Sequence, residues 1–272
     1  MADMSVPVPD VPEDGFEAVF AVAGGLEQER WERATARVLF EELGPVSAFP
    51  VIPGKRWGPG WWWSATTGKH VAQGSAAMVV QLMLLDRDPR VVAMAGRPVR
   101  VLWRDPQGRG VVRSWVPQLF ARYADGTGLL ADCPGTPGAG GAAAQRAAAA
   151  VGQACARVGW VYRRLRAPDP VMVGNVRWLS GYRHPRFRGA EQVEAAVMAV
   201  FADPLPLVEG VRAVGNPLVV LPVVYHALWA RRLRAPLDRP LHGGVLVGPG
   251  PAWTEPGVGV GFVAGEGAGV AW

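Results

Sequence analysis

The sequence is poor in cysteine and in lysine, and the shortage of cysteine excludes two classes of protein. Of 272 residues, only Cys133 and Cys155 are cysteines, too few for a disulfide framework or a cysteine-based zinc site. Only Lys55 and Lys69 among the twenty-eight basic residues are lysines. A bias in overall composition explains that preference without any function.

Several motifs of catalysis and nucleotide binding are also missing. The chain has no His-Glu-x-x-His, no Gly-x-Ser-x-Gly, no Gly-x-x-x-x-Gly-Lys, and no Gly-x-Gly-x-x-Gly between a strand and a helix. The four histidines, at positions 70, 184, 226 and 242, lack the spacing of metal ligands. Zinc-protease, serine-hydrolase and nucleotide-binding functions are therefore unsupported.

Signals for secretion or membrane insertion are absent as well. Residues 1–14 hold four acids and neither a basic region nor a continuous apolar region. The longest uncharged apolar stretch of the body, 216–230, is too short to span a bilayer and contains two prolines. We expect a protein of the reducing cytoplasm.

Charge is present but unevenly divided. Residues 1–45 carry ten acids and three arginines, net −7, whereas residues 46–272 carry thirteen acids and twenty-five basic residues, net +12. A basic body favours a polyanionic partner, although a solvated arginine surface accounts equally well for charge alone. The opposite signs also raise the hypothesis that the acidic region covers the basic face in the free protein.

Composition and periodicity predict four parts. Residues 1–45 are an acidic region, poorly ordered to residue 25 and helical over 26–43. Residues 46–166 are an α/β core, 167–242 a small helical domain for which a winged helix is one candidate, and 243–272 a glycine-rich flexible tail.

The predicted core runs helix, strands, helix, strand. Residues 75–86 are apolar almost all round, which indicates a buried helix, and Asp125-Gly126 between apolar runs indicates a hairpin. The predicted strands are 91–95, 99–103, 111–116, 119–123, 127–132 and 160–165, and the further helices are 142–158, 170–181, 190–202 and 218–232. Residues 53–63 are predicted as a Gly/Pro loop whose tryptophans stack on bases or pack beneath the loop.

The stretch from the buried helix to Pro134 resembles the restriction-endonuclease-like nuclease core, an α/β fold with a mixed sheet flanked by helices. That core carries Pro-Asp, then a hairpin, then Asp/Glu-x-Lys. More closely, the chain resembles the TnsA-type endonuclease subunit of heteromeric transposases. The likeness covers about residues 55–242 and is carried by LMLLDRDPRVVAMAGRP (82–98), RSWVPQLFARYADGTGLLAD (113–132) and NVRWLSGYRHPR (175–186).

This resemblance implies a subunit that cuts DNA at the 5′ ends of a mobile element. Its partners would be double-stranded DNA, an integrase-like transposase subunit and, as a further candidate, an ATPase of the same element. It also implies Mg²⁺ held chiefly by two carboxylates, with a lysine near the metal-bound water.

The catalytic positions of this chain depart from that pattern. Gln118 replaces the first acid, Pro134 stands in place of the lysine, and only Asp132 is retained. The preceding helix, where a glutamate is expected, offers Gly74, Ser75 and Met78.

Three functions stay open. The first is a TnsA-like subunit that binds DNA at mobile-element ends and is catalytically impaired. The second is an active Mg²⁺-dependent endonuclease with a rearranged site that recruits Asp86 or Asp125, with Asp132 as a metal ligand. The third is a non-enzymatic scaffold or regulatory protein that keeps the fold. Asp132 also has a plain structural explanation, as a residue that satisfies the hairpin end.

Two clusters in the second domain are candidate phosphate contacts. One lies in and after a predicted helix and the other follows the last apolar helix. A solvated face explains the first equally well, and the helix dipole favours cations at the second. The residues are Arg177, Arg183, His184 and Arg186, and then Arg231, Arg232 and Arg234.

Overall fold

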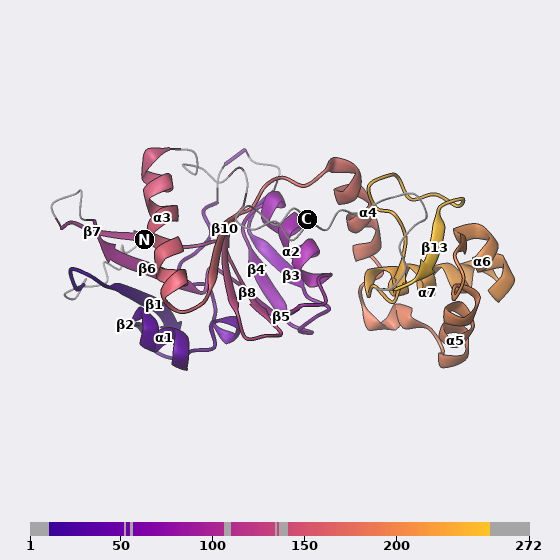
Figure 1. Cartoon of the computed structure of the whole chain (residues 1–272), viewed down its shortest axis with the longest axis horizontal. Coiled ribbons are helices and arrows are strands. Elements are labelled where there is room, and N and C mark those ends of the chain that lie inside the picture. Colours follow the sequence, from indigo (N-terminus) through magenta and orange to yellow (C-terminus); the bar gives the residue numbers. More distant parts are fainter. Residues whose placement is uncertain are drawn as a thin grey trace. The chain divides into compact units, whose positions relative to one another are not determined.

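The structure is a computed structural model that describes residues 11–51, 53–54, 57–105, 110–133, 135 and 141–250. The chain divides into two compact units, residues 1–167 and 168–272 (Figure 1). No helix in the described ranges is long and apolar enough to cross a membrane.

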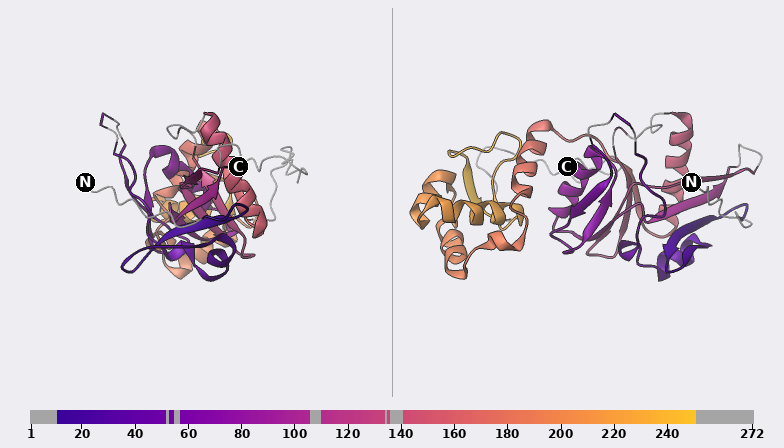
Figure 2. Two further views of the ribbon diagram at one scale, coloured as in Figure 1. Left: turned by 90° about the vertical axis from the view of Figure 1, so that its left-hand side faces the viewer. Right: turned by 180° about the vertical axis from the view of Figure 1, so that it is seen from behind.

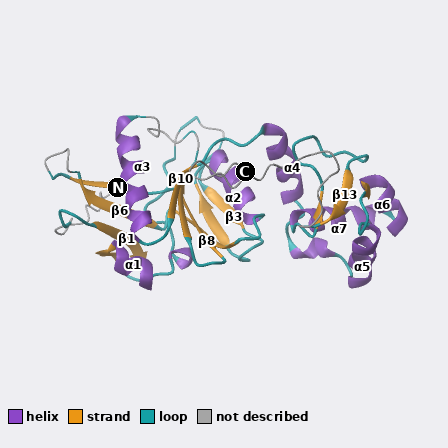
Figure 3. Cartoon of the chain, in the orientation of Figure 1, coloured by secondary structure: helices purple, strands orange, loops and turns teal. Residues whose placement is uncertain are grey.

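The first unit is mixed α/β, and its central sheet has the strand order β10-β9-β8-β5 (Figure 3). Neighbouring strands β5, β8 and β9 are antiparallel, whereas β10 is parallel to β9. Helix α3 connects β9 to β10, because parallel neighbours need a long crossover. The bounds are α2 (Ala76–Asp86), β5 (Val91–Gly96), β8 (Leu119–Tyr123), β9 (Gly128–Asp132), α3 (Ala142–Arg157) and β10 (Val161–Arg164).

The sequence-based prediction is confirmed for these elements to within about two residues at their ends. Ser75 caps α2 as its side chain accepts a hydrogen bond from Met78 N at 3.2 Å. Gly126, at φ 88°, closes the predicted β8–β9 hairpin, a backbone conformation that favours glycine.

A second sheet in the same unit has the order β2-β1-β6-β7, all antiparallel. A short third sheet pairs β3 with β4, and Gly96 lets β4 approach β5, since an added Cβ would meet Ala72 O at 2.0 Å. The bounds are β1 (Phe16–Val22), β2 (Gly25–Arg30), β3 (Gly60–Trp63), β4 (His70–Gln73), β6 (Val99–Arg104) and β7 (Val112–Trp115).

Helices α2 and α3 cover opposite faces of the central sheet (Figures 1 and 2). On the α3 side, one hydrophobic cluster joins β1, β6, α3 and the central sheet. Its centre is aromatic: Phe40 packs within about 6 Å of Trp31, Phe120 and Trp160 between ring centroids. The indole N–H of Trp31 donates to Ala154 O on α3 at 2.6 Å.

The predicted N-terminal region is wrong in two respects. Residues 16–22 are strand β1 inside the core rather than poorly ordered chain, and the predicted helix 26–43 is strand β2, a short helix α1 (Trp31–Arg37) and a 3₁₀ turn (Phe40–Glu42). The sequence pattern of Trp31, Ala34 and Val38 is helical, but pairing with β1 holds residues 25–30 extended. Tertiary pairing overrides local propensity here.

Two other predictions also need correction. The loop predicted at 53–63 ends in strand β3 instead, because Gly60–Trp63 pairs with β4. The tail predicted from residue 243 begins with an ordered strand, β13 (Leu246–Pro249), and residues 251–272 lie outside the described ranges.

The second unit is built from helices and a small antiparallel sheet of order β11-β13-β12. The three predicted helices are confirmed, while the eight-residue helix α6 was not predicted. Asn216 caps α7 by accepting from Leu218 N at 3.0 Å. The bounds are α4 (Pro170–Ser180), η3 (Pro185–Arg188), α5 (Glu191–Val200), β11 (Leu205–Pro206), α6 (Leu207–Val214), α7 (Pro217–Trp229) and β12 (Leu233–Arg234).

Candidate functional site

Gln118 and Asp132 lie side by side at the open end of the β8–β9 hairpin. Gln118 directly precedes β8 and Asp132 ends β9, so the antiparallel register brings them together. The backbone N–H of Gln118 donates to Asp132 Oδ1 at 3.2 Å. The side-chain oxygen of Gln118 accepts from the backbone N–H of Cys133 at 3.1 Å.

Asp132 is buried, with 4% of the residue's surface exposed. Its Oδ2 accepts from the indole N–H of Trp115 at 2.7 Å and from the hydroxyl of Tyr162 at 2.6 Å. With the Gln118 amide, three donors occupy most of the about four acceptor positions of a carboxylate. Burial raises the pKa of Asp132, and the hydrogen bonds and the charge of Arg164 oppose that rise.

The residues around Asp132 do not fit Mg²⁺. This ion prefers near-octahedral oxygen ligands, usually with one or two carboxylates. Asp132 is a single carboxylate whose oxygens face N–H and O–H groups, and the side-chain oxygen of Gln118 is already engaged. Within the ranges that the structure describes, no group of three or more His, Cys, Asp or Glu is placed to hold a metal. Pro134, at the lysine position, lies outside the described residues.

The start of α2 serves folding at the positions where a glutamate ligand is expected. Ser75 is the helix cap, and Met78 is fully buried. The backbone N–H of Gly74 contacts the Met78 sulfur at 3.4 Å. A glutamate would place a charge in this apolar packing.

The two alternative acids each hold a loop of their own. Asp86, at the C-terminal end of α2, accepts hydrogen bonds from Trp62, Ser64 and two backbone N–H groups of the β3–β4 loop. Asp125 lies in the turn at the far end of the β8–β9 hairpin, where it accepts from Thr127 N at 2.9 Å. Both acids are explained by the loops that they hold.

Arginines near Asp132 were missed by the sequence analysis. Arg164 is paired in register with Asp132 on the edge strand β10, and Arg163 beside it is also exposed. Arg97, in the turn between β5 and β6, donates its backbone N–H to Gln118 O at 3.0 Å. These residues come from separate segments, so no local motif marks them; the Arg163-Arg164 pair was the only sequence signal.

The first predicted basic cluster forms one short segment of the second unit. Arg177 is exposed on α4, and Arg183 donates to Ser180 O at 2.7 Å. The His184 ring accepts from Arg186 N at 3.2 Å, which begins η3, while the Arg186 guanidinium lies 4.8 Å from the Phe187 ring centroid. Phosphate contact by Arg177, Arg183, His184 and Arg186 stays a prediction.

The second predicted cluster follows α7, and one member has a structural role. Arg232 pairs with Glu194, a buried carboxylate that Arg188 also contacts at 2.7 Å. Arg231 has φ 58° at the end of the helix, and Arg234 lies on strand β12. Arg232 and Arg188 therefore share the neutralisation of a buried acid.

Helix α7 presents apolar rather than polar side chains to solvent. Leu218 is 85% exposed and Val219 56% exposed, and the helix contains no arginine or lysine. Its His226 contacts Tyr182 O at 2.8 Å through Nδ1. Base edges are read mainly through hydrogen-bond donors and acceptors, and apolar side chains contact only the thymine methyl group; Leu218 and Val219 therefore offer no hydrogen bond to a base edge.

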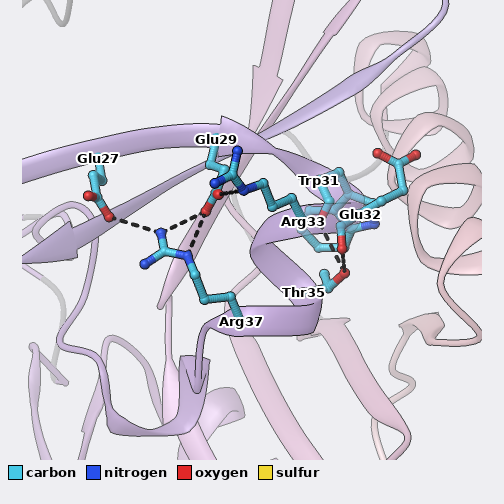
Figure 4. Close-up of polar contacts among 7 residues, drawn as sticks. All are labelled: Glu27, Glu29, Trp31, Glu32, Arg33, Thr35 and Arg37. Atoms are coloured by element: carbon cyan, nitrogen blue, oxygen red, sulfur yellow. Dashed lines mark hydrogen bonds and ion pairs between the residues drawn. The ribbon is translucent and has the colours of Figure 1, made fainter.

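The acidic N-terminal residues pair with arginines of their own segment. Arg37 contacts Glu29 at 2.7 Å and Glu27 at 3.4 Å, and Arg33 contacts Glu29 at 2.8 Å (Figure 4). Glu41 pairs with Arg122 on β8. Arg33 and Arg37 are already counted in the net charge of −7, so among these pairs only Glu41–Arg122 offsets part of that charge.

The tryptophans of β3 differ in their exposure, and the two cysteines are both buried. Trp62 is buried and hydrogen-bonded to Asp86, as the packing alternative predicts. Trp61 is 68% exposed, and its stacking on bases stays a prediction. Cys133 and Cys155 are buried, as expected for small apolar residues. Burial raises the pKa of both thiols, that of Cys155 to about 12, which leaves them unreactive at neutral pH.

Comparison with known proteins gives no family. A scan against protein-family models finds no match for this chain, and a search of curated proteins finds no match either.

Proposed function

We propose that the protein is a TnsA-like, DNA-binding subunit of a heteromeric transposition complex that does not itself cut DNA. The observation that carries this proposal is the state of Asp132. It is held by Trp115, Tyr162 and Gln118, beside an amide where a metal-binding acid is expected. A site without a second carboxylate lacks the charge that two-carboxylate metal catalysis needs.

The order of elements supports the restriction-endonuclease-like part of the proposal. Helix α2, antiparallel strands β5, β8 and β9, helix α3 and parallel strand β10 follow one another as the resemblance implies. Strands β6 and β7 are inserted between β5 and β8 and belong to the other sheet. Gln118 and Asp132, at the positions that the resemblance assigns to the two catalytic acids, are hydrogen-bonded at the hairpin end, which supports this part of the proposal.

The second unit supports a winged-helix interpretation in the same way. Its order is helix α5, strand β11, helices α6 and α7, then strands β12 and β13. The last strand lies between the other two, as in a helix-turn-helix with a wing. Because α7 is apolar outside, we assign DNA contact to the exposed arginines rather than to base reading by this helix.

In this proposal the residues bind and position DNA without a bond-breaking step. Exposed arginines neutralise backbone phosphates, and Trp115, Tyr162 and Gln118 keep the hairpin end rigid through Asp132. Cutting and joining then belong to the integrase-like transposase subunit, with an ATPase as a further partner.

The test combines binding and cutting in one experiment. The full chain, alone and with any transposase subunit encoded beside it, is incubated with supercoiled DNA in Mg²⁺, in Mn²⁺ and in chelator. We expect no nicking and an affinity that falls with salt but is unchanged by chelator. Asp132→Ala is the control variant, which shows whether any nicking depends on Asp132.

Either contrary outcome selects another function. Metal-dependent nicking that is lost in Asp132→Ala would establish the active endonuclease. Failure to bind duplex DNA at low salt, alone and with the transposase subunit, would leave the scaffold or regulatory protein.

A further inference from the structure

The second unit holds an apolar groove between helices α4, α6 and α7 and the loop that precedes β13. Its volume is about 490 Å³, and none of the described residues that line it is a lysine, arginine, aspartate or glutamate. The lining side chains that keep contact with solvent are Trp178, Val208, Leu221, Tyr225 and Leu241. A groove without cations does not neutralise phosphates, so its chemistry suits an apolar segment of protein rather than the DNA backbone.

One wall of this groove is fixed by a buried side chain of α4. The Asn175 amide donates to Leu237 O at 2.9 Å and to Arg239 O at 2.7 Å. Its side-chain oxygen accepts from Leu241 N at 3.0 Å. These bonds hold the loop before β13 against the helix, so the groove is formed before anything enters it and little ordering is needed on binding.

The chain itself contains a segment whose pattern matches the groove. Residues 257–263 read Gly-Val-Gly-Val-Gly-Phe-Val, contain no charged residue and lie outside the described ranges. Successive side chains of an extended chain point to opposite faces. An extended segment therefore places Val258, Val260 and Phe262 on one face and the glycines on the other. Covering an apolar surface with that one face removes both from water, which is favourable.

The segment is long enough to reach the groove from the last described residue. The backbone N–H of Val208 donates to the O atom of Gly243, and both residues line the groove. Gly250, seven positions later, lies within about 25 Å of Gly243, because an extended chain advances at most about 3.6 Å per residue. The residues from 251 to Val258 can span that distance again, and Pro256-Gly257 is a turn signal that allows the chain to reverse.

We propose that the groove is the docking surface for residues 258–262 of the same chain. The segment lies in it as an extended strand, with Val258, Val260 and Phe262 inward and the glycines toward solvent. Docking covers the ring of Trp178, which is 56% exposed, and so removes an apolar surface through which chains could associate. The groove and the segment both belong to the second unit, and the inference does not depend on DNA binding.

The first arm of the test cross-links the full chain. Val208→Cys and Val260→Cys are introduced together and treated with a short bismaleimide, while the native Cys133 and Cys155 are buried and do not compete. The matched control uses Ala213→Cys in place of Val208→Cys, at an exposed position of the same helix that does not line the groove. Each rate is divided by the labelling rate of the corresponding single-cysteine protein. We expect the intrachain cross-link to form at least about tenfold faster at the groove, because docking raises the effective concentration of the two thiols.

The second arm tests whether the apolar face is responsible for docking. Phe262→Asp puts a charge on that face and should lower the cross-linking rate at Val208→Cys to that of the control. Ala268→Asp adds the same charge outside the segment and should leave the rate unchanged. Circular dichroism melts verify that both variants keep the fold of the parent protein.

Each contrary outcome has its own meaning. Equal rates at positions 208 and 213 would overturn the docking and leave the groove to another protein. Cross-links that join two chains rather than one would assign the groove to a second copy. A rate difference that survives Phe262→Asp would overturn the arrangement with this face inward. The proposed function is tested by DNA binding and nicking, so it stands or fails separately.

Discussion

Gln118 and Asp132 are joined at the hairpin end by a hydrogen bond of 3.2 Å from the backbone of the first to the carboxylate of the second. The side-chain oxygen of Gln118 accepts a hydrogen bond from the backbone N–H of Cys133, the residue after Asp132. A neutral amide can lie against a buried carboxylate without repulsion, whereas a second carboxylate cannot unless a cation lies between them. The substitution at residue 118 and the enclosure of Asp132 therefore depend on each other.

Restoring an acid at residue 118 should destabilise the protein. Gln118→Asp places a like charge against Asp132 and leaves the Cys133 amide unpaired, at a cost of about 1–3 kcal/mol at neutral pH. Urea unfolding of the two proteins measures it. Mg²⁺ should recover part of the loss in Gln118→Asp and leave the wild type unchanged; stabilisation of the wild type by Mg²⁺ would contradict the poor fit of this site to the metal.

The stability of the wild type relative to Asp132→Asn should depend on pH. Burial raises the pKa of Asp132 above that of the unfolded chain, so between about pH 4 and the raised value the native state binds a proton that the unfolded state has released. This contribution is complete below about pH 4 and is lost as the pH rises through the native pKa. Asn cannot titrate, so Asp132→Asn should gain on the wild type from pH 4 to pH 7 in urea titrations. Parallel pH profiles would contradict the shift.

The N-terminal segment should be indispensable for the first unit. Trp31 is fully buried and bonded to Ala154 O, so Trp31→Ala should cost about 3–5 kcal/mol. Deleting residues 1–45 should abolish cooperative unfolding of that unit rather than raise DNA affinity. Circular dichroism melts of both variants test this, and a folded deletion variant that binds DNA more tightly would instead favour a covering role for the acidic region.

The exposed face of α7 should be dispensable for DNA binding. Leu218→Ser and Val219→Ser alter side chains that are largely exposed, so stability should stay within about 0.5 kcal/mol. Affinity for duplex DNA should be unchanged in electrophoretic mobility shifts. Arg186→Ala is the comparison, because it removes a predicted phosphate contact and should reduce the salt slope by about 1.

The strands and helices between residues 75 and 165 could be predicted because each carries its own local signal. Alternating apolar residues, the Asp125-Gly126 turn and the Ser75 cap all lie within a few residues of the elements that they define. Strand β2 has no such signal: Gly25–Arg30 is mostly charged or polar and is extended because it pairs with β1.

The candidate site also has one part that the sequence predicted and one part that it did not. The resemblance assigned Gln118 and Asp132 to one site, and the register of the β8–β9 hairpin brings them together. Trp115, Tyr162 and Arg97 reach the site from other segments, and the left-handed backbone of Arg97 leaves no mark in the sequence. Long-range register, rather than local pattern, assembles this part of the site.

The bond between Trp31 and Ala154 also has a consequence for synthesis on the ribosome. The two residues are 123 positions apart, so β1 and Trp31 leave the ribosome on the order of ten seconds before the chain that buries them is made. During that interval Phe16, Phe20 and Trp31 lack their α3 partners. The ten acids of the first forty-five residues give the nascent segment a strong negative charge, which opposes association between incomplete chains.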